Sequence, residues 1–286
     1  YEIGFCLVGS EMCIRDSLDT KEKLQLFWTF LFFVLSCLAK PLAVSFALVL
    51  PLIHHYHGKG VKEWLVPKNW LTYAPFFLGA LFFGLLILSN QEENVVGHEG
   101  QFQGWGRQIV FAGDAFTTYL FKAVLPLNLS VIYNYPAAID QPIPVVSLVK
   151  FGVAVLGLIA TIWLLKKNKA LAFGGLFFFV NIVFVLQLVP MGVGYKADRF
   201  VYIAVLGLFW MIATGVQQLL EKNKISTSTM KYSFGGYIVV LSLLTLLRTG
   251  DWKDSMSLWN ATIEVNPDSY IAYNNRGELF METNQW

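Results

Sequence analysis

A series of apolar runs, each long enough to cross a lipid bilayer as a helix, constrains this chain more than any other feature. A spanning helix needs roughly 17–25 mostly apolar residues. Charged residues make up only 14% of the chain, whereas soluble domains carry about 25%. The sequence therefore predicts an all-α protein, a polytopic bundle of membrane helices whose surface mostly faces lipid. Five runs are separate and clear: residues 71–89, 146–165, 170–189, 201–220 and 232–248.

A longer apolar stretch, residues 24–55, is interrupted by Lys40 and Pro41. At about 1.5 Å per helical residue, this stretch is too long for one span and short for two. Proline disfavours helix at the residue before it and removes a hydrogen bond from the helical ladder. We therefore expect two short helices that meet at Lys40, which brings the total to about seven spans.

Lysines gather in four of the connectors, and basic loops tend to lie on the cytoplasmic side of a membrane. If all four do so, the spans alternate correctly only when residues 90–145 begin and end outside. The apolar stretch at about 107–125 then does not span, and its pattern predicts an amphipathic helix in the outer interface. Its polar stripe is Arg107, Asp114, Thr118 and Lys122, opposite Ile109, Phe116 and Leu120. We interpret Asp114 and Lys122 as part of this stripe rather than as an acid/base pair.

The polar segment 251–286 follows the transmembrane domain, which we expect over residues 18–250. It has helical spacing with a proline between two halves, and it fits the register of a tetratricopeptide repeat on the extracytoplasmic side. The alternative is an ordinary amphipathic hairpin beside the membrane. Because such repeats need neighbours for stability, we expect the intact protein to continue into further repeats. The matching positions are Ser255, Trp259, Thr262 and Pro267 in the first half and Tyr273, Gly277 and Phe280 in the second.

Residues 1–17 contain CLVGSEMCIRDS, which resembles translated sequencing-adapter read-through, and we expect them to be an artefact. The net charge of +2 is spread over short clusters between apolar runs, which argues against a nucleic-acid partner. His54, His55 and His57 suggest no metal site, because adjacent histidines on a helix point in different directions and no acidic or cysteine ligand is near. No cofactor is expected.

Three stretches, in this order, resemble the transmembrane and tetratricopeptide repeat proteins, a family that includes O-mannosyltransferases of the secretory pathway. They are AKPLAVSFALVLPL (39–52), PLNLSVIYNYP (126–136) and DRFVYIAVLG (198–207), followed by the repeat-like tail. The family is similar to the GT-C glycosyltransferases, which use polyprenyl-phosphate sugars. The resemblance covers about residues 24–286 and implies a partial GT-C-like membrane domain.

The resemblance also implies which residues act. The family's catalytic carboxylates lie in the first outer loop, which we expect upstream of this partial chain, so no residue here inherits that role. At the donor phosphate we expect Lys196 and Arg199 to hold the anion, Asp198 to orient Arg199, and Tyr202 and Lys40 to contribute. Helix capping and snorkelling to the interface are the alternatives. Asp198 stands where relatives often carry Glu.

Tyr133, Asn134 and Tyr135 are candidates for a sugar or acceptor groove, with an interfacial aromatic belt as the alternative.

The resemblance implies transfer of a sugar from a polyprenyl-phosphate donor to protein hydroxyls, as in O-mannosylation, at the outer membrane face. The alternatives are a non-catalytic membrane-anchored repeat scaffold and a lipid-linked oligosaccharide ligase. Membrane lipid and a protein bound by the repeats are the expected partners. The adapter-like start suggests a bacterial inner membrane with a periplasmic tail.

Overall fold

The computed structural model describes residues 23–57, 67–91, 103–188 and 194–282, so the prediction for residues 1–17 lies outside it. The described part contains ten α-helices and one isolated β-bridge, and the all-α prediction is confirmed. The α-helices are α2 (Lys23–Ala39), α3 (Phe46–His57), α4 (Pro67–Gln91), α5 (Trp105–Val124), α6 (Val145–Lys167), α7 (Lys169–Ile182), α8 (Ala204–Glu221), α9 (Thr227–Thr249), α10 (Ser255–Val265) and α11 (Tyr270–Glu282). Short 3-10 helices are η1 (Pro41–Ser45), η4 (Val183–Val185), η5 (Asp198–Val201) and η6 (Gly250–Trp252).

Four of the described helical segments are long and apolar enough to cross a membrane, and they indicate an integral membrane protein. They are Thr72–Ser89, Val145–Lys167, Ala204–Glu221 and Thr227–Trp252. About seven spans were predicted, and the difference lies in α2, α3 and α7, which are shorter. The first two are separated where predicted, since Lys40 is extended and Pro41 begins a 3-10 turn. In the same way α7 gives way to a 3-10 turn, and Gln187 beyond it has a φ of 55°.

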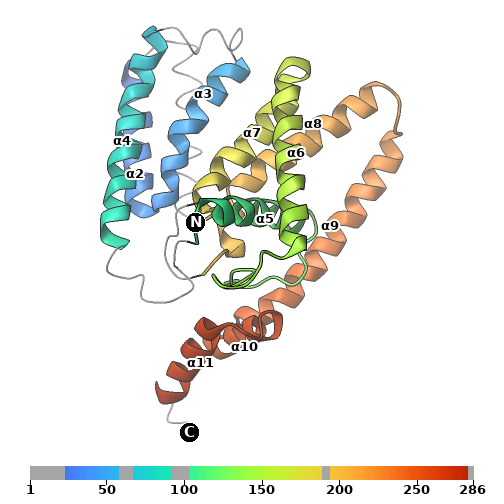
Figure 1. Cartoon of the computed structure of the whole chain (residues 1–286). Helices are drawn as coiled ribbons and strands as arrows, with labels where there is room; N and C mark the ends of the chain where they lie inside the picture. Colours follow the sequence, from blue (N-terminus) through green and yellow to red (C-terminus); the bar gives the residue numbers. More distant parts are fainter. Residues whose placement is uncertain (1–22, 58–66, 92–102, 189–193, 283–286) are drawn as a thin grey trace. The chain divides into compact units, whose positions relative to one another are not determined.

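The chain forms two compact units. The first unit holds α2, α3, α4 and α7, with the first part of α8 (Figure 1). Its core contains Phe33, Phe46 and Phe76, whose ring centroids lie 5.6–6.1 Å apart. Ser45 donates to Asn181 at 2.9 Å, which ties η1 to α7. Burying these large side chains supplies most of the favourable free energy of such packing within the unit.

The second unit holds α5, the loop after it, the first part of α6, residues 194–202 and α9 to α11. The predicted helix at about 107–125 is present as α5. However, Asp114 is only 2% exposed while Ile109 is 45% exposed, the reverse of a polar stripe that faces water. The physical reason is that Lys150 and Lys196 stabilise the buried carboxylate by ion pairs, in place of the water that would hydrate it at the surface. The interfacial position of this helix stays a prediction.

The segment after the last apolar helix folds into a hairpin of α10 and α11, which pack side by side (Figure 1). Asp254 caps α10 by accepting from the Ser257 N–H at 2.7 Å. Thr262 and Ala272 are fully buried between the helices, so small residues do allow a close approach. By contrast, a Cβ at Gly277 would meet nothing within 4 Å, so this hairpin alone gives the predicted tight-packing glycine no partner. The tetratricopeptide assignment stays a prediction.

Two glycines allow the backbones of α7 and α8 to touch. A Cβ at Gly207 would lie 2.7 Å from the backbone nitrogen of Phe178, and one at Gly174 would lie 3.0 Å from that of Met211. Close crossings at small residues are a common way for helices to associate in membranes.

We predict that Gly207→Ala destabilises the protein by about 1–3 kcal/mol, because the added methyl group meets backbone atoms that cannot move independently. Gly215→Ala on the same helix is the matched control, since a Cβ there meets nothing within 4 Å. Thermal unfolding in detergent, followed by intrinsic fluorescence, measures both variants. A Gly207→Ala protein as stable as the Gly215→Ala protein would contradict the close crossing.

Candidate functional site

Two loops of the second unit are joined by a short antiparallel bridge between Tyr133 and Lys196. The Tyr133 N–H donates to the Lys196 carbonyl at 2.9 Å, and the Tyr195 N–H donates to the Tyr133 carbonyl at 2.9 Å. Gly194 precedes the bridge with a φ of 96° and lies so close to Ile132 that a side chain would not fit. The bridge therefore brings together two segments that are more than sixty residues apart in the sequence.

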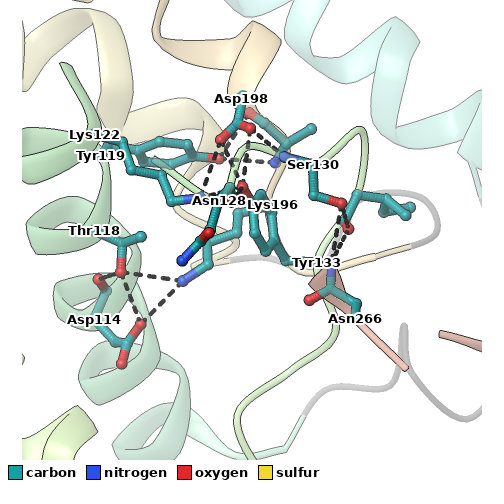
Figure 2. Close-up of polar contacts among 12 residues, drawn as sticks. Asp114, Thr118, Tyr119, Lys122, Asn128, Ser130, Tyr133, Lys196, Asp198 and Asn266 are labelled. Atoms are coloured by element: carbon teal, nitrogen blue, oxygen red, sulfur yellow. Dashed lines mark hydrogen bonds and ion pairs between the residues drawn. The ribbon is translucent and has the colours of Figure 1, made fainter. Parts of the chain in front are cut away.

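Beneath the bridge lies a buried ion-pair cluster around Asp114 on α5, which we call the Asp114 cluster (Figure 2). Lys196 reaches the Asp114 carboxylate at 3.2 Å, and Lys150 of α6 reaches it at 3.3 Å. Ser147 donates to the same carboxylate at 2.9 Å, and Thr118 lies 3.1 Å from the Lys196 Nζ. One carboxylate thus holds two lysines from two different segments.

The close approach of α6 to α5 makes this cluster possible. A Cβ at Gly113 would lie 2.8 Å from the Cα of Phe151, so only glycine allows the two helices to cross here. The crossing places Ser147 and Lys150, one helical turn apart, beside Asp114. Thr117 adds a 2.6 Å hydrogen bond to the Lys150 carbonyl.

Burial and charge oppose each other in the Asp114 cluster. Burial alone would raise the pKa of Asp114, but Lys196, Lys150 and the Ser147 hydroxyl together hold it below its usual value. Burial lowers the pKa of Lys196 to about 8, although Asp114 counters part of that effect. Both shifts leave the pair ionised at pH 7. The pair is therefore a stable charge pair, and its lysine is easier to deprotonate than an exposed one.

A second group of polar side chains, the Asp198 cluster, lies on the other side of Tyr133 (Figure 2). The Asp198 carboxylate accepts from the Tyr133 hydroxyl at 2.9 Å and from the Ser130 N–H at 2.6 Å. Lys122 of α5 lies 3.9 Å from it and hydrogen-bonds the Tyr133 hydroxyl and the Asn128 carbonyl. The Tyr133 ring lies 4.3 Å from the Nζ of Lys122 and 5.6 Å from that of Lys196, so it separates two ammonium groups.

The electrostatics of the Asp198 cluster differ from those of Asp114. Burial raises the pKa of Asp198, and the partial compensation by Lys122 and by the hydrogen bonds does not reverse the shift. Burial also lowers the pKa of Lys122 and, together with Asp198, raises that of Tyr133. The fold therefore tolerates a neutral side chain at Asp198 better than at Asp114.

The turn between α10 and α11 docks on the first of the two loops. The Asn266 side-chain amide donates to the Ser130 hydroxyl at 2.9 Å and to the Ile132 carbonyl at 3.1 Å (Figure 2). The Asn134 side chain donates in turn to the Asp268 carbonyl at 3.0 Å. The hairpin is thus bonded on both sides of Tyr133.

The residues predicted from sequence for a donor-phosphate site are only partly gathered. Lys196 and Asp198 lie in the two clusters described above. Arg199 is exposed and donates to the Val131 carbonyl at 3.1 Å, while Asp198, expected to orient it, contacts Tyr133 and Ser130 instead. Tyr202 is 70% exposed. Lys40 lies in the first unit, at the break before η1.

The residues predicted for a sugar or acceptor groove are neighbours on the loop but face different surroundings. Tyr133 is buried between the two clusters, and Asn134 bonds the hairpin turn. The ring of Tyr135 packs 4.8 Å from that of Tyr195 and 5.9 Å from that of Phe111. Tyr135 therefore has more of a packing role than the sequence suggested.

Sequence reasoning missed Ser147 and Lys150, and it placed Asp114 and Lys122 on an exposed stripe. One signal was available for Lys150, because a lysine inside an apolar spanning run needs a partner and often marks a functional site. For Ser147 there was no comparable signal, since a serine in an apolar helix is common. The pairing of Lys122 with Asp198 depends on the loop path, which the sequence alone does not give.

The arrangement contains more cations than anions. Among the described residues, Lys122, Lys150 and Lys196 pair with two carboxylates, and the exposed Arg199 follows Asp198 in the chain. The side chain of Lys150 is 33% exposed, so this positive charge is partly open to a ligand. Such a surplus favours an anion, and an arginine fork suits a phosphate or a carboxylate.

We predict that Asp114→Asn destabilises the protein by about 3–5 kcal/mol at pH 7, because it leaves two lysines without their buried partner. Asp198→Asn is the matched control and should cost clearly less, since the fold raises the pKa of that carboxyl group. Because the pKa of Lys196 is already lowered in the folded state, loss of Asp114 lowers it further. Lys196 in the variant then loses its proton at a lower pH than in the wild type, so the deficit should shrink as the pH rises toward about 8, the pKa of Lys196 in the wild type.

Thermal unfolding across this pH range in detergent measures the effect. Equal costs for the two asparagine variants, or an Asp114→Asn deficit that grows as the pH rises, would contradict the assignment of Asp114 as the central anion.

Comparison with known proteins gives a partial similarity. Protein O-mannosyl-transferase Tmtc2 of Drosophila melanogaster is 30% identical over 76 residues, which cover 27% of this chain and 8% of that protein. Protein O-mannosyl-transferase tmtc2 of Xenopus laevis is 32% identical over 85 residues, which cover 29% of this chain and 10% of that protein. The chain thus spans at most a tenth of the length of these curated relatives. No family model and no solved structure matches it. Over less than a third of its length, the chain is similar to protein O-mannosyl-transferases.

Proposed function

We propose that this chain is part of a membrane glycosyltransferase of the GT-C type. It would transfer a sugar from a polyprenyl-phosphate donor to protein hydroxyls at the outer face of the membrane. The observation that carries the proposal is the surplus of positive charge at the Tyr133–Lys196 bridge. The partial similarity to protein O-mannosyl-transferases supports the same class of reaction.

The chemistry of such a transfer explains why cations are needed. When the sugar leaves, negative charge grows on the lipid phosphate, and fixed positive groups stabilise that charge. Arg199 is the best placed residue for direct contact, because its guanidinium is exposed and, among the described residues, donates to the Val131 carbonyl through a single N–H group. Lys196 is buried and bonded to Asp114, so its role would be to hold the loop and add to the local field.

The acceptor side of the proposal rests on the hairpin. If α10 and α11 begin a tetratricopeptide array, the array would present a protein segment to Asn134 and Tyr135, close to the donor site. The bonds from Asn266 and Asn134 support this arrangement, since they hold the hairpin against the loop. We also propose that the shorter apolar helices complete about seven spans, with the hairpin on the periplasmic side of a bacterial inner membrane.

A second candidate is a non-catalytic membrane-anchored scaffold. One observation favours it: the carboxylates of the two clusters already have protein partners, and polar contacts of the same loop also dock the hairpin. In this alternative the two clusters only fix the geometry of an interaction platform. The two functions differ in whether the chain binds a sugar-phosphate lipid.

We predict that the full chain in nanodiscs binds a radiolabelled polyprenyl-phosphate sugar saturably, and that Arg199→Gln weakens the binding by roughly 10- to 100-fold. A hydrogen bond to a charged group contributes about 1.5–3 kcal/mol, which corresponds to that range. Arg276→Gln is the matched control, because Arg276 lies on α11 and bonds Asn260 at 3.0 Å.

Failure of the wild-type chain to bind the donor saturably would favour the scaffold. Unchanged affinity in the Arg199→Gln protein, with intact thermal stability, would remove Arg199 from the donor site.

A further inference from the structure

A pocket of about 370 Å³ lies between the loop after α5 and the last two turns of α9. This volume falls in the range of roughly 300–1,000 Å³ that is usual for small-molecule sites. Its walls come from both segments and from η6. The lining residues are Pro126, Leu129, Leu244, Thr245, Arg248, Thr249 and Trp252.

The pocket lies at the C-terminal end of α9, a helix whose other faces are mostly exposed. In α9 the half-buried positions Tyr237, Leu241, Leu244 and Arg248 form one stripe, and the Tyr237 hydroxyl donates to the Val124 carbonyl at 2.6 Å. The neighbouring Leu246 and Leu247 are 68% and 76% exposed. Because Thr227–Trp252 is a candidate span, this end of α9 lies where hydrocarbon gives way to headgroups.

Apolar walls and one cation are combined in the pocket. Arg248 is the only charged residue in the lining, and its guanidinium donates to Asp251 at 2.7 Å. This bond leaves other N–H donors of the fork for a second anion, and Arg248 has no further side-chain partner among the described residues. The two threonine hydroxyls donate to helix carbonyls, so their oxygens remain acceptors rather than donors toward a ligand.

The surroundings of the pocket contribute charges of both signs. The charge of Arg248 acts on Lys122 and on Asp198, which belong to the Asp198 cluster. Asn128 and Ser130 of that cluster also alternate along the loop with Leu129, which lines the pocket. An occupant would therefore meet a cationic end and an apolar body.

We infer that this pocket binds a membrane phospholipid, with its anionic phosphate at Arg248 and the beginning of one acyl chain between Leu129, Leu244 and Trp252. An apolar chain fits between the apolar walls. A phosphate can accept hydrogen bonds from the guanidinium N–H groups that do not bond the Asp251 carboxylate. The site is distinct from the exposed Arg199, and the inference holds whether or not the chain transfers a sugar. The bound lipid would fill the gap between the loop and the last span.

The test uses quenching of Trp252 fluorescence by lipids with brominated acyl chains, in the full chain reconstituted in nanodiscs. Trp252→Phe identifies the Trp252 signal among the nine tryptophans. We expect brominated phosphatidic acid to quench this signal at about five-fold lower mole fraction than brominated phosphatidylcholine, since one basic residue near an anionic headgroup contributes on that order. Added inorganic phosphate should not reverse the quenching, because the acyl chain carries part of the binding.

Five variants distinguish binding in the pocket from a general attraction of anionic lipid to the membrane interface of the protein. Arg248→Gln should abolish the preference for phosphatidic acid, Arg248→Lys should retain most of it, and Lys231→Gln at the other end of α9 should leave it unchanged. Thr245→Phe should block quenching by filling the pocket, while Leu246→Phe on the exposed side should not. Equal quenching by the two lipids, or a preference that survives Arg248→Gln, would overturn the inference.

Discussion

The buried ion pair between Asp114 and Lys196 is the interaction on which the second unit depends. Its two partners come from α5 and from the loop before α8, and Lys150 brings α6 to the same carboxylate. Breaking a buried pair costs far more than its net contribution to stability, because a charge is left without a partner. The pair therefore fixes where the second loop runs, and through the Tyr133–Lys196 bridge it fixes the first loop as well.

Further contacts connect this ion pair to the hairpin of α10 and α11. Tyr133 links the Asp114 cluster to Asp198 and Lys122, and the same loop then receives the Asn266 side chain from the hairpin. A substitution at Asp114 should therefore perturb the packing of the segment that follows the last apolar helix. Both proposed functions require this connection between the charge clusters and the hairpin of α10 and α11. They differ in whether the remaining positive charge meets a donor phosphate.

The sequence predicted the helical membrane class, the break at Lys40 and a helix near 107–125, because hydrophobic periodicity and proline act locally. It could not predict how short the helices α3 and α7 would be, since their apolar runs are shared with the 3-10 turns η1 and η4. The predicted orientation of α5 was also wrong at Asp114. A polar stripe has the same sequence pattern whether its side chains face water or pair with buried lysines. The pairing of Lys122 with Asp198 depends on a loop path set by Gly194 and by the β-bridge, which no local pattern reveals.

In the proposed glycosyltransferase, the anion of the donor lies at the Tyr133–Lys196 bridge. The most direct measurement is a cryo-electron microscopy structure of the full chain in nanodiscs with a non-transferable donor analogue, a polyprenyl phosphonate sugar. We predict density for the phosphonate in contact with Arg199 and within reach of Lys150 or Lys122. A bound analogue whose phosphonate lies away from these residues, or a chain that holds no analogue at saturating concentration, would contradict it.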